Sequence, residues 1–231
     1  MEKASRKPMV YRHERKYLVE NVRFAEMRMA ILTHPAGFLP LFQPRYINNI
    51  YLDTLGFDFY YDNVDGEWFR TKYRVRWYGD LYQHIEKPVL EIKAKKGLVG
   101  TKYAFRLKPF CLDASFNAER WAEIIRSSDF PDDARGAVAG LKPVLLNRYL
   151  RSYFISLDKK FRVTIDSQMS YFPFSGNNPA SRDHALHDNT IVVELKYAPE
   201  DDQEAREISA AFPFLLTKSS KYLHGIERLM V

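Results

Sequence analysis

Charged and apolar residues alternate along three runs between Lys72 and Lys108, and this alternation constrains the fold more than any other feature of the chain. The charged members are Lys72, Arg74, Arg76, Glu91, Lys93, Lys102 and Arg106. The residues between them are Tyr73, Val75, Trp77, Leu90, Ile92, Ala94, Tyr103, Phe105 and Leu107. A period of two puts the charged side chains on one face of each strand and the apolar ones on the other.

The same pattern returns at residues 11–17, 161–166 and 191–197, far away along the chain. The bases on the polar faces of the six strands are Arg12, Lys16, Lys72, Arg74, Arg76, Lys93, Lys102, Arg106, Arg162 and Lys196. The acids among them are Glu14, Glu91, Asp166 and Glu194. If these faces point inward, they form a cationic lumen with a few carboxylates, which suits a polyanion together with a divalent metal. The alternative is a solvated sheet face with cross-strand salt bridges.

Composition narrows the class of protein. A chain of 231 residues with 46% hydrophobic and 15% aromatic residues is long and apolar enough to bury a core, and we expect one domain over residues 1–231. The net charge of +6 points to anionic partners. Cys111 is the single cysteine, and we find neither an apolar run that could span a bilayer nor a signal peptide, so we expect a cytoplasmic protein without a membrane segment.

Irregularly spaced helices separate the predicted strands, which argues against a repeating strand–helix–strand fold. Further strands are expected at 46–53 and 144–156, and a loop at 174–189. Helices are expected at 21–33, 117–128, 132–141, 204–212 and 219–229, with a helical turn at 57–63. About eight strands suffice for a barrel whose interior one ligand can fill. We therefore predict an α+β fold: an antiparallel eight-stranded tunnel barrel with flanking helices.

Several short motifs, in order along nearly the whole chain, resemble the CYTH or triphosphate tunnel metalloenzyme superfamily. Within it the chain looks most like the VTC domain, the catalytic part of the eukaryotic vacuolar polyphosphate polymerase and its bacterial relatives. The motifs are RHERKY at 12–17, YLDT at 51–54, RVRWYG at 74–79, LEIK at 90–93, NRYLR at 147–151, RVTID at 162–166, VELK at 193–196 and SKYLHG at 220–225. Arg12 stands where the superfamily's first strand often has a glutamate, which also resembles VTC members.

The resemblance implies a tunnel whose basic residues bind a triphosphate or polyphosphate and whose carboxylates hold Mg²⁺ or Mn²⁺. By position, the residues implied to clamp the reacting phosphates are Lys16, Arg74, Arg76, Lys93, Arg106 and Arg151. Those implied to bind substrate nearby are Lys102, Tyr149, Arg162, Lys196, Lys218 and Lys221. Glu194 is the foremost implied metal ligand, followed by Glu14 and Glu91.

Three functions remain open from the sequence. The first is a polyphosphate polymerase, a phosphotransferase that moves the γ-phosphoryl group of ATP onto a growing chain. The second is a triphosphatase acting on inorganic, nucleoside or thiamine triphosphate. The third is a non-catalytic binder of polyphosphate or nucleic acid. Nucleic acid is the less favoured ligand. Proteins that bind single-stranded nucleic acid place aromatic residues among exposed Lys and Arg side chains, whereas here the Lys and Arg residues alternate with apolar residues of a packing face.

Overall fold

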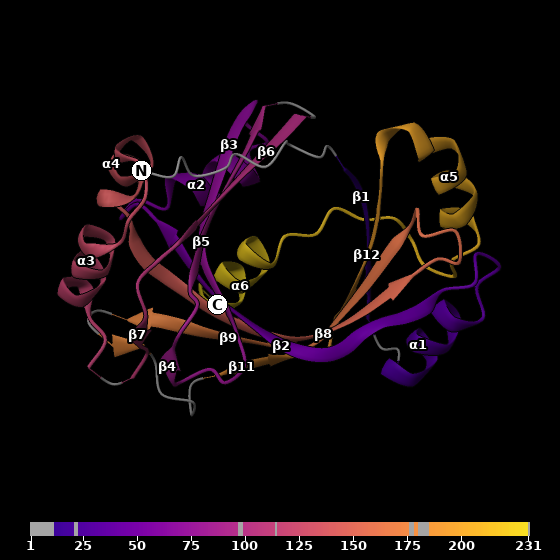
Figure 1. The fold of residues 1–231 in the computed structure, drawn as a ribbon, viewed down its shortest axis with the longest axis horizontal. Helices are drawn as coiled ribbons and strands as arrows, with labels where there is room; N and C mark the ends of the chain where they lie inside the picture. Colours follow the sequence, from indigo (N-terminus) through magenta and orange to yellow (C-terminus); the bar gives the residue numbers. More distant parts are fainter. Residues whose placement is uncertain are drawn as a thin grey trace.

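The computed structural model describes residues 12–20, 23–96, 99–113, 115–175, 178–179 and 185–230. Eight antiparallel strands form the main sheet. In spatial order they are β1 (His13–Val19), β12 (Ile191–Tyr197), β9 (Arg162–Ser175), β8 (Lys142–Ile155), β2 (Leu39–Asp53), β3 (Phe69–Tyr78), β5 (Val89–Lys96) and β6 (Val99–Arg106). The sheet curls into a half-barrel, and within the described residues no pairing joins β1 to β6 (Figure 1). The predicted α+β, antiparallel eight-stranded tunnel fold is confirmed.

Among the described residues, four short strands and one short helix complete the connections. β4 (His84–Ile85) pairs with β7 (Phe110–Cys111), while β10 (Asn178–Pro179) and β11 (Leu186–Asp188) both pair with β9. The 3₁₀ helix η2 (Pro199–Asp201) leads into α5. The loop predicted at 174–189 is therefore partly strand, and its residues 176–177 and 180–184 lie outside the described part of the chain.

Two groups of helices cover the convex side of the sheet, and a further helix lies within its curve (Figure 1). The helices are α1 (Phe24–Leu32), α2 (Asp58–Val64), α3 (Ala118–Ser127), α4 (Asp132–Ala139), α5 (Asp202–Ala210) and α6 (Lys221–Met230). Buried side chains of α3 and α4 pack in one core with β3 and β5, and those of α1 and α5 pack in a second core with β9 and β12. Helix α6 lies within the curve of the sheet, where Tyr222 and Ile226 pack on β2, β8 and β9.

The sequence alternation explains which face of each strand is buried under the helices. On β3, Val75 and Trp77 are almost completely buried in the core below α3 and α4. Arg74 and Arg76, which alternate with them, point to the concave side, where they meet Glu91. The predicted separation into a packing face and a cationic face therefore holds on this strand.

Strand β2 is longer than predicted, because it begins at Leu39 rather than near Tyr46. Prolines at 40 and 44 argue against a regular strand, since proline cannot donate a ladder hydrogen bond. The structure accommodates them at irregularities, with register shifts between Pro40 and Phe42 and between Phe42 and Arg45.

Among the helices of the described residues, none is both long and apolar enough to cross a membrane.

Candidate functional site

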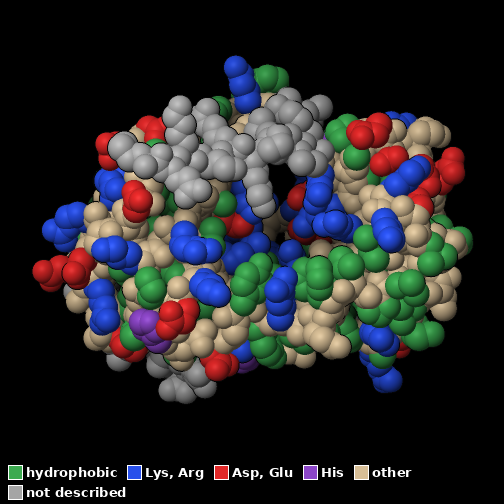
Figure 2. All heavy atoms as spheres, in the orientation of Figure 1, with side chains coloured by type: hydrophobic (Ala, Val, Ile, Leu, Met, Phe, Trp, Pro, Cys, Tyr) green, Lys and Arg blue, Asp and Glu red, His purple; other side chains and the backbone are tan. Residues whose placement is uncertain are grey.

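The concave side of the sheet forms a lumen lined by two walls and a floor. Strands β3, β5 and β6 make one wall, β1 and β12 make the other, and β2, β8 and β9 make the floor with α6 lying on it (Figure 1). A space-filling view shows a hollow at the centre of the molecule, with Lys and Arg side chains around and inside it (Figure 2). We call this hollow the lumen.

On the first wall, Glu91 binds three cations at once. Nη2 of Arg74 lies 2.6 Å from its Oε2, and Nη1 of Arg76 lies 3.7 Å from the same oxygen. Lys102 forms an ion pair with the other oxygen, Oε1. Burial acts to raise the pKa of Glu91, but the three cations outweigh it and hold that pKa far below its usual range. Glu91 is therefore a charged anchor that fixes the two arginines in place.

Two lysines on the same wall, Lys72 and Lys93, are buried close to other cations, and this lowers the pKa of both. Burial, with Lys16 and Arg70 among the nearby cations, lowers the pKa of Lys72 to about 7. The charge of Arg74, together with burial, lowers the pKa of Lys93 to about 7. Lys72 donates a hydrogen bond to Ser220 Oγ at 2.9 Å. A bound anion would relieve this repulsion and restore the full charge of both lysines.

On the opposite wall, Glu194 lies among cations from three strands. Its carboxylate is 2.8 Å from Nζ of Lys196, 3.4 Å from Nζ of Lys16 and 3.6 Å from Nη2 of Arg151. Burial acts to raise the pKa of Glu194, and the surrounding lysines and arginine lower it well below its usual value. The carboxylate therefore stays ionised in the lumen.

Glu14 is the second carboxylate of this wall, and it extends toward the same lysines. It lies 3.8 Å from Lys16 and 3.9 Å from Lys196. Burial and the charge of Glu194 act to raise the pKa of Glu14, and the lysines around it, Lys93 of the other wall among them, lower it overall. Lys93 of the first wall therefore acts electrostatically on a carboxylate of the opposite wall.

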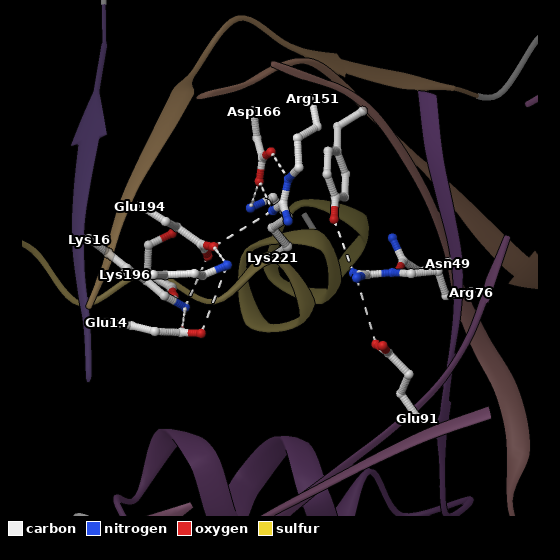
Figure 3. A network of polar contacts seen from close by, with 12 residues as sticks. Glu14, Lys16, Asn49, Arg76, Glu91, Arg151, Asp166, Glu194, Lys196 and Lys221 are labelled. Carbon is white, nitrogen blue, oxygen red and sulfur yellow. Dashed lines mark hydrogen bonds and ion pairs between the residues drawn. The ribbon is translucent and has the colours of Figure 1, made fainter. Parts of the chain in front are cut away.

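On the floor, Asp166 joins a strand arginine to a helix lysine. Its two oxygens accept hydrogen bonds from Arg151 at 2.5 Å and 2.6 Å, and Nζ of Lys221 lies 2.6 Å away. Figure 3 shows Arg151, Asp166 and Lys221 side by side, with Glu194, Lys196 and Lys16 on one side and Arg76 and Glu91 on the other. The side chains of the site therefore form a network of ion pairs in which cations outnumber carboxylates.

Tyr149 connects the floor to the first wall. Its hydroxyl accepts a hydrogen bond from Nη2 of Arg76 at 3.1 Å, and its ring lies 4.9 Å from Nζ of Lys221 and 5.3 Å from the guanidinium of Arg151. Burial acts to raise the pKa of Tyr149, whereas Arg151 and Arg76 lower it overall. Three phosphate-binding candidates therefore surround one buried ring.

Helix α6 is held tightly against the floor. Tyr222 donates a hydrogen bond to Asp53, the carboxylate whose oxygens also accept from the backbone N–H groups of Phe59 and Tyr60. At Gly225 a methyl group would lie 2.6 Å from side-chain atoms of both Leu145 and Tyr171. A glycine at this position lets the helix approach the sheet closely and so brings Lys221 to Asp166.

Most of the predicted site residues converge on this lumen. Those that meet in the network are Glu14, Lys16, Arg74, Arg76, Glu91, Lys93, Lys102, Tyr149, Arg151, Glu194, Lys196 and Lys221. Arg106 and Arg162 lie on lumen-facing positions of their strands but are exposed, and Lys218 is exposed before the start of α6.

Three residues that the sequence did not assign to the site belong to its geometry. Lys72 and Asp166 alternate with apolar residues in the sequence. Nothing in the local sequence, however, distinguishes them from the other charged residues on the same strand faces. Asn49 accepts a hydrogen bond from Nε of Arg76 at 2.9 Å, and its Nδ2 donates to Asn147 at 3.3 Å. A pair of asparagines within an apolar run gives no functional signal by itself.

Of the two walls, the one formed by β1 and β12 has the carboxylates that better suit a divalent cation. Among the described residues, no three His, Cys, Asp or Glu side chains are grouped closely enough to hold a metal by themselves. Mg²⁺ does not need such a cage, because it binds one or two carboxylates together with substrate phosphates and water. Glu194 and Glu14 fit this arrangement, because their cation contacts are ion pairs of 2.8 Å or longer. Both oxygens of Glu91, by contrast, accept hydrogen bonds from Arg74 and Lys102.

The model of one protein family, the VTC domain, matches residues 11–230. This chain belongs to the VTC domain family. A search of curated proteins found no match.

Solved structures share the fold of this VTC domain at low sequence identity. A Bacillus halodurans protein provisionally named an adenylate cyclase is 16% identical, with a TM-score of 0.52 over 94% of this chain and 96% of that one. A Hippeastrum protein provisionally named an adenylyl cyclase, and described as having a dominant triphosphatase activity, is 13% identical, with a TM-score of 0.51 and the same coverage. A Pyrococcus horikoshii OT3 protein is 13% identical, with a TM-score of 0.50 over 96% and 100%.

Proposed function

We propose that this VTC domain is a metal-dependent polyphosphate polymerase that transfers the γ-phosphoryl group of ATP to a polyphosphate chain held in the lumen. The observation that carries the proposal is the excess of buried cations on facing walls. Burial and the neighbouring cations together lower the pKa of both Lys72 and Lys93 to about 7. A lumen of this kind gains most from a ligand with several closely spaced negative charges. ATP, triphosphate and polyphosphate are ligands of this class.

The arginines and lysines have different parts in holding such a ligand. Arg74, Arg76 and Arg151 offer planar guanidinium groups that can bind two phosphate oxygens at once. Lys16, Lys93 and Lys196 add compact charges from both walls. The ion pairs to Glu91, Glu194 and Asp166 hold these side chains in place before the ligand binds, which lowers the entropy lost on binding.

The reaction needs no base to start it. An ionised terminal oxygen of the acceptor chain attacks the γ-phosphorus, the bond from that phosphorus to the β–γ bridging oxygen breaks, and ADP leaves with the electron pair. Such transfers depend on alignment and on neutralisation of charge on the equatorial and bridging oxygens. The fixed cations on the floor and walls supply both.

Glu194, with Glu14 beside it, would hold Mg²⁺ or Mn²⁺ against the phosphates. When bound, the metal neutralises charge that develops on the transferred group and on the leaving diphosphate. The carboxylate of Glu194 is already ionised among Lys196, Lys16 and Arg151, so it is prepared for a cation that a polyphosphate brings into the lumen.

A second candidate function is hydrolysis of a triphosphate. The Hippeastrum protein with the same fold is described as a triphosphatase, and a lumen that aligns a triphosphate for one acceptor also aligns it for water. Polymerase and hydrolase differ in the acceptor and not in the phosphate clamp.

Incubation with γ-labelled ATP and Mn²⁺, resolved on a gel, separates the functions. The proposal predicts label in long polyphosphate chains that a polyphosphate-specific phosphatase degrades. Label in free phosphate alone would support the triphosphatase. Retention of all label in ATP, despite binding of triphosphate, would contradict both enzymes and leave a binding module.

A further inference from the structure

An arginine surrounded by aromatic rings lies beyond the phosphate-clamping residues on the same face of the sheet. We call it the Arg45 cluster, defined as Phe42, Arg45, Tyr78 and Tyr153. The guanidinium carbon of Arg45 lies 4.4 Å from the ring centre of Tyr78, 5.0 Å from that of Tyr153 and 5.9 Å from that of Phe42. Nε of Arg45 also donates a hydrogen bond to the hydroxyl of Tyr153 at 3.1 Å.

Strand register joins this cluster directly to the lumen. Arg45 on β2 pairs with Arg151 on β8, so both side chains point to the concave face. Tyr153 follows Arg151 by two residues, and Tyr78 follows Arg76 by two. Residues two apart on a strand share a face and lie about 7 Å from each other. The rings therefore continue the same rows that carry the clamp arginines.

The rings of the cluster remain available to a ligand. Phe42 is 57% exposed and Tyr78 is 49% exposed, and Arg45 is exposed as well. Phe42 and Tyr153 meet edge to face, with ring centres 5.6 Å apart, so Tyr153 supports Phe42 from one side. Exposed rings held in place by neighbours form a flat surface on which another flat group can stack.

We propose that the Arg45 cluster stacks the base of a nucleoside triphosphate whose phosphates lie among Arg76 and Arg151. This inference rests on the proposed function, because it needs a triphosphate in the lumen. Aromatic rings and guanidinium planes bind the π-face of any nucleobase. In a nucleotide, one ribose separates the base from the nearest phosphate. Here about two strand residues separate the rings of Tyr78 and Tyr153 from Arg76 and Arg151, which is a similar spacing. The cluster would thus give this lumen a preference for nucleotides over inorganic triphosphate.

Two probes in the presence of EDTA test the inference by calorimetry: the non-hydrolysable ATP analogue with a β,γ-imido bridge, and inorganic triphosphate. The combined Phe42→Ala and Tyr78→Ala variant should bind the analogue about tenfold more weakly. Its affinity for inorganic triphosphate should equal that of the wild type. Unchanged triphosphate binding also shows that the variant is folded and its lumen intact.

The chain provides a matched control on the convex face. There Arg148 lies 3.9 Å from the ring centre of Tyr46. Both residues alternate with the lumen-facing pair Ile47 and Tyr149, so this contact of the same kind lies away from the lumen. Tyr46→Ala should leave the affinities for both probes unchanged. If the double variant lost affinity equally for both probes, or lost none for the analogue, the inference would be overturned and the proposed function would stand. A wild-type protein that binds neither probe would overturn the proposed function, and this inference with it.

Discussion

Nζ of Lys221, on a helix, lies 2.6 Å from Oδ2 of Asp166, on the sheet beneath it. Asp166 is completely buried and also binds Arg151 through both of its oxygens. One carboxylate therefore balances the positive charges of Arg151 on β8 and Lys221 on α6. The contact fixes α6 to the floor of the lumen and holds two cations where a phosphate could reach them.

Replacement of Asp166 by Asn should destabilise the protein in the absence of an anion. The buried cations of Arg151 and Lys221 would lose the charge that compensates them, which costs about 3 kcal/mol in the free energy of unfolding. Urea denaturation measures this loss. Saturating triphosphate should recover much of it, since the ligand supplies the missing negative charge and binds only the folded state.

The exposed Asp132, which lies 3.6 Å from Arg135, offers the control for that variant. Asp132→Asn should change the free energy of unfolding by less than about 0.5 kcal/mol. A stable Asp166→Asn protein, equal to the wild type without any anion, would show that the cations of the floor do not depend on this carboxylate.

A methyl group at Gly225 should disturb the lumen without touching it. The added carbon would lie 2.6 Å from Leu145 and Tyr171, so Gly225→Ala must push α6 from the sheet at a cost of about 1–3 kcal/mol. Because α6 carries Lys221, the affinity for triphosphate should fall as well. Thermal denaturation and calorimetry measure the two effects.

Gly136 on α4 is the matched substitution, because a methyl group there meets no atom within 4 Å. Gly136→Ala should be neutral or stabilise the helix by up to about 1 kcal/mol. If Gly225→Ala bound triphosphate as tightly as Gly136→Ala, the position of α6 would not matter to the lumen.

The strands of this fold could be predicted where a two-residue period separates charge from apolar residues. Val75 and Trp77 lie in the core and Arg74 and Arg76 in the lumen for that reason alone. The first half of β2 could not be predicted this way. Its prolines and register shifts remove the period, and only pairing with β8 reveals the strand.

The choice among site residues could be predicted less well than the strands. Local pattern cannot tell that Glu91 accepts hydrogen bonds from Arg74 and Lys102 while Glu194 forms ion pairs with Lys196 and Lys16, since both glutamates alternate with apolar neighbours. It also cannot show that α6 lies inside the curve of the sheet, which is what brings Lys221 to Asp166. These facts depend on how distant segments pack. The assigned roles of all these residues stay predictions.

The affinity for triphosphate should fall as pH rises above about 7. Burial and neighbouring cations lower the pKa of Lys72 to about 7 in the protein without ligand. A bound polyanion would raise that pKa, so binding above pH 7 takes up a proton. Linkage then weakens the observed affinity by up to about tenfold per pH unit for each such lysine. Calorimetry in buffers of different ionisation enthalpy counts the protons.

Lys72→Arg keeps the positive charge but does not titrate in this range. Its affinity should therefore depend less on pH than that of the wild type, and its binding should take up fewer protons. Identical proton uptake in the two proteins would exclude Lys72 as the group responsible.

Replacement of Glu194 by Gln should separate chemistry from binding. The variant loses the charge that attracts the metal, so metal-dependent turnover should fall by about a hundredfold or more. Metal-free binding of triphosphate should persist or strengthen, because one negative charge leaves the lumen. Glu86, whose side chain is 72% exposed, gives a control that should keep full activity as Glu86→Gln. Full turnover of Glu194→Gln would transfer the metal assignment to Glu14.

The most direct test of the account is a calorimetric titration of inorganic triphosphate into the wild type and Arg76→Ala, with EDTA and at low salt. The account predicts saturable binding to the wild type that weakens as salt rises, because the attraction is electrostatic. Arg76→Ala should bind about tenfold or more weakly, since it loses a charge-assisted contact in the lumen. A wild type that does not bind triphosphate, or an Arg76→Ala variant that binds it equally well, would contradict the claim that this lumen is a phosphate-binding site.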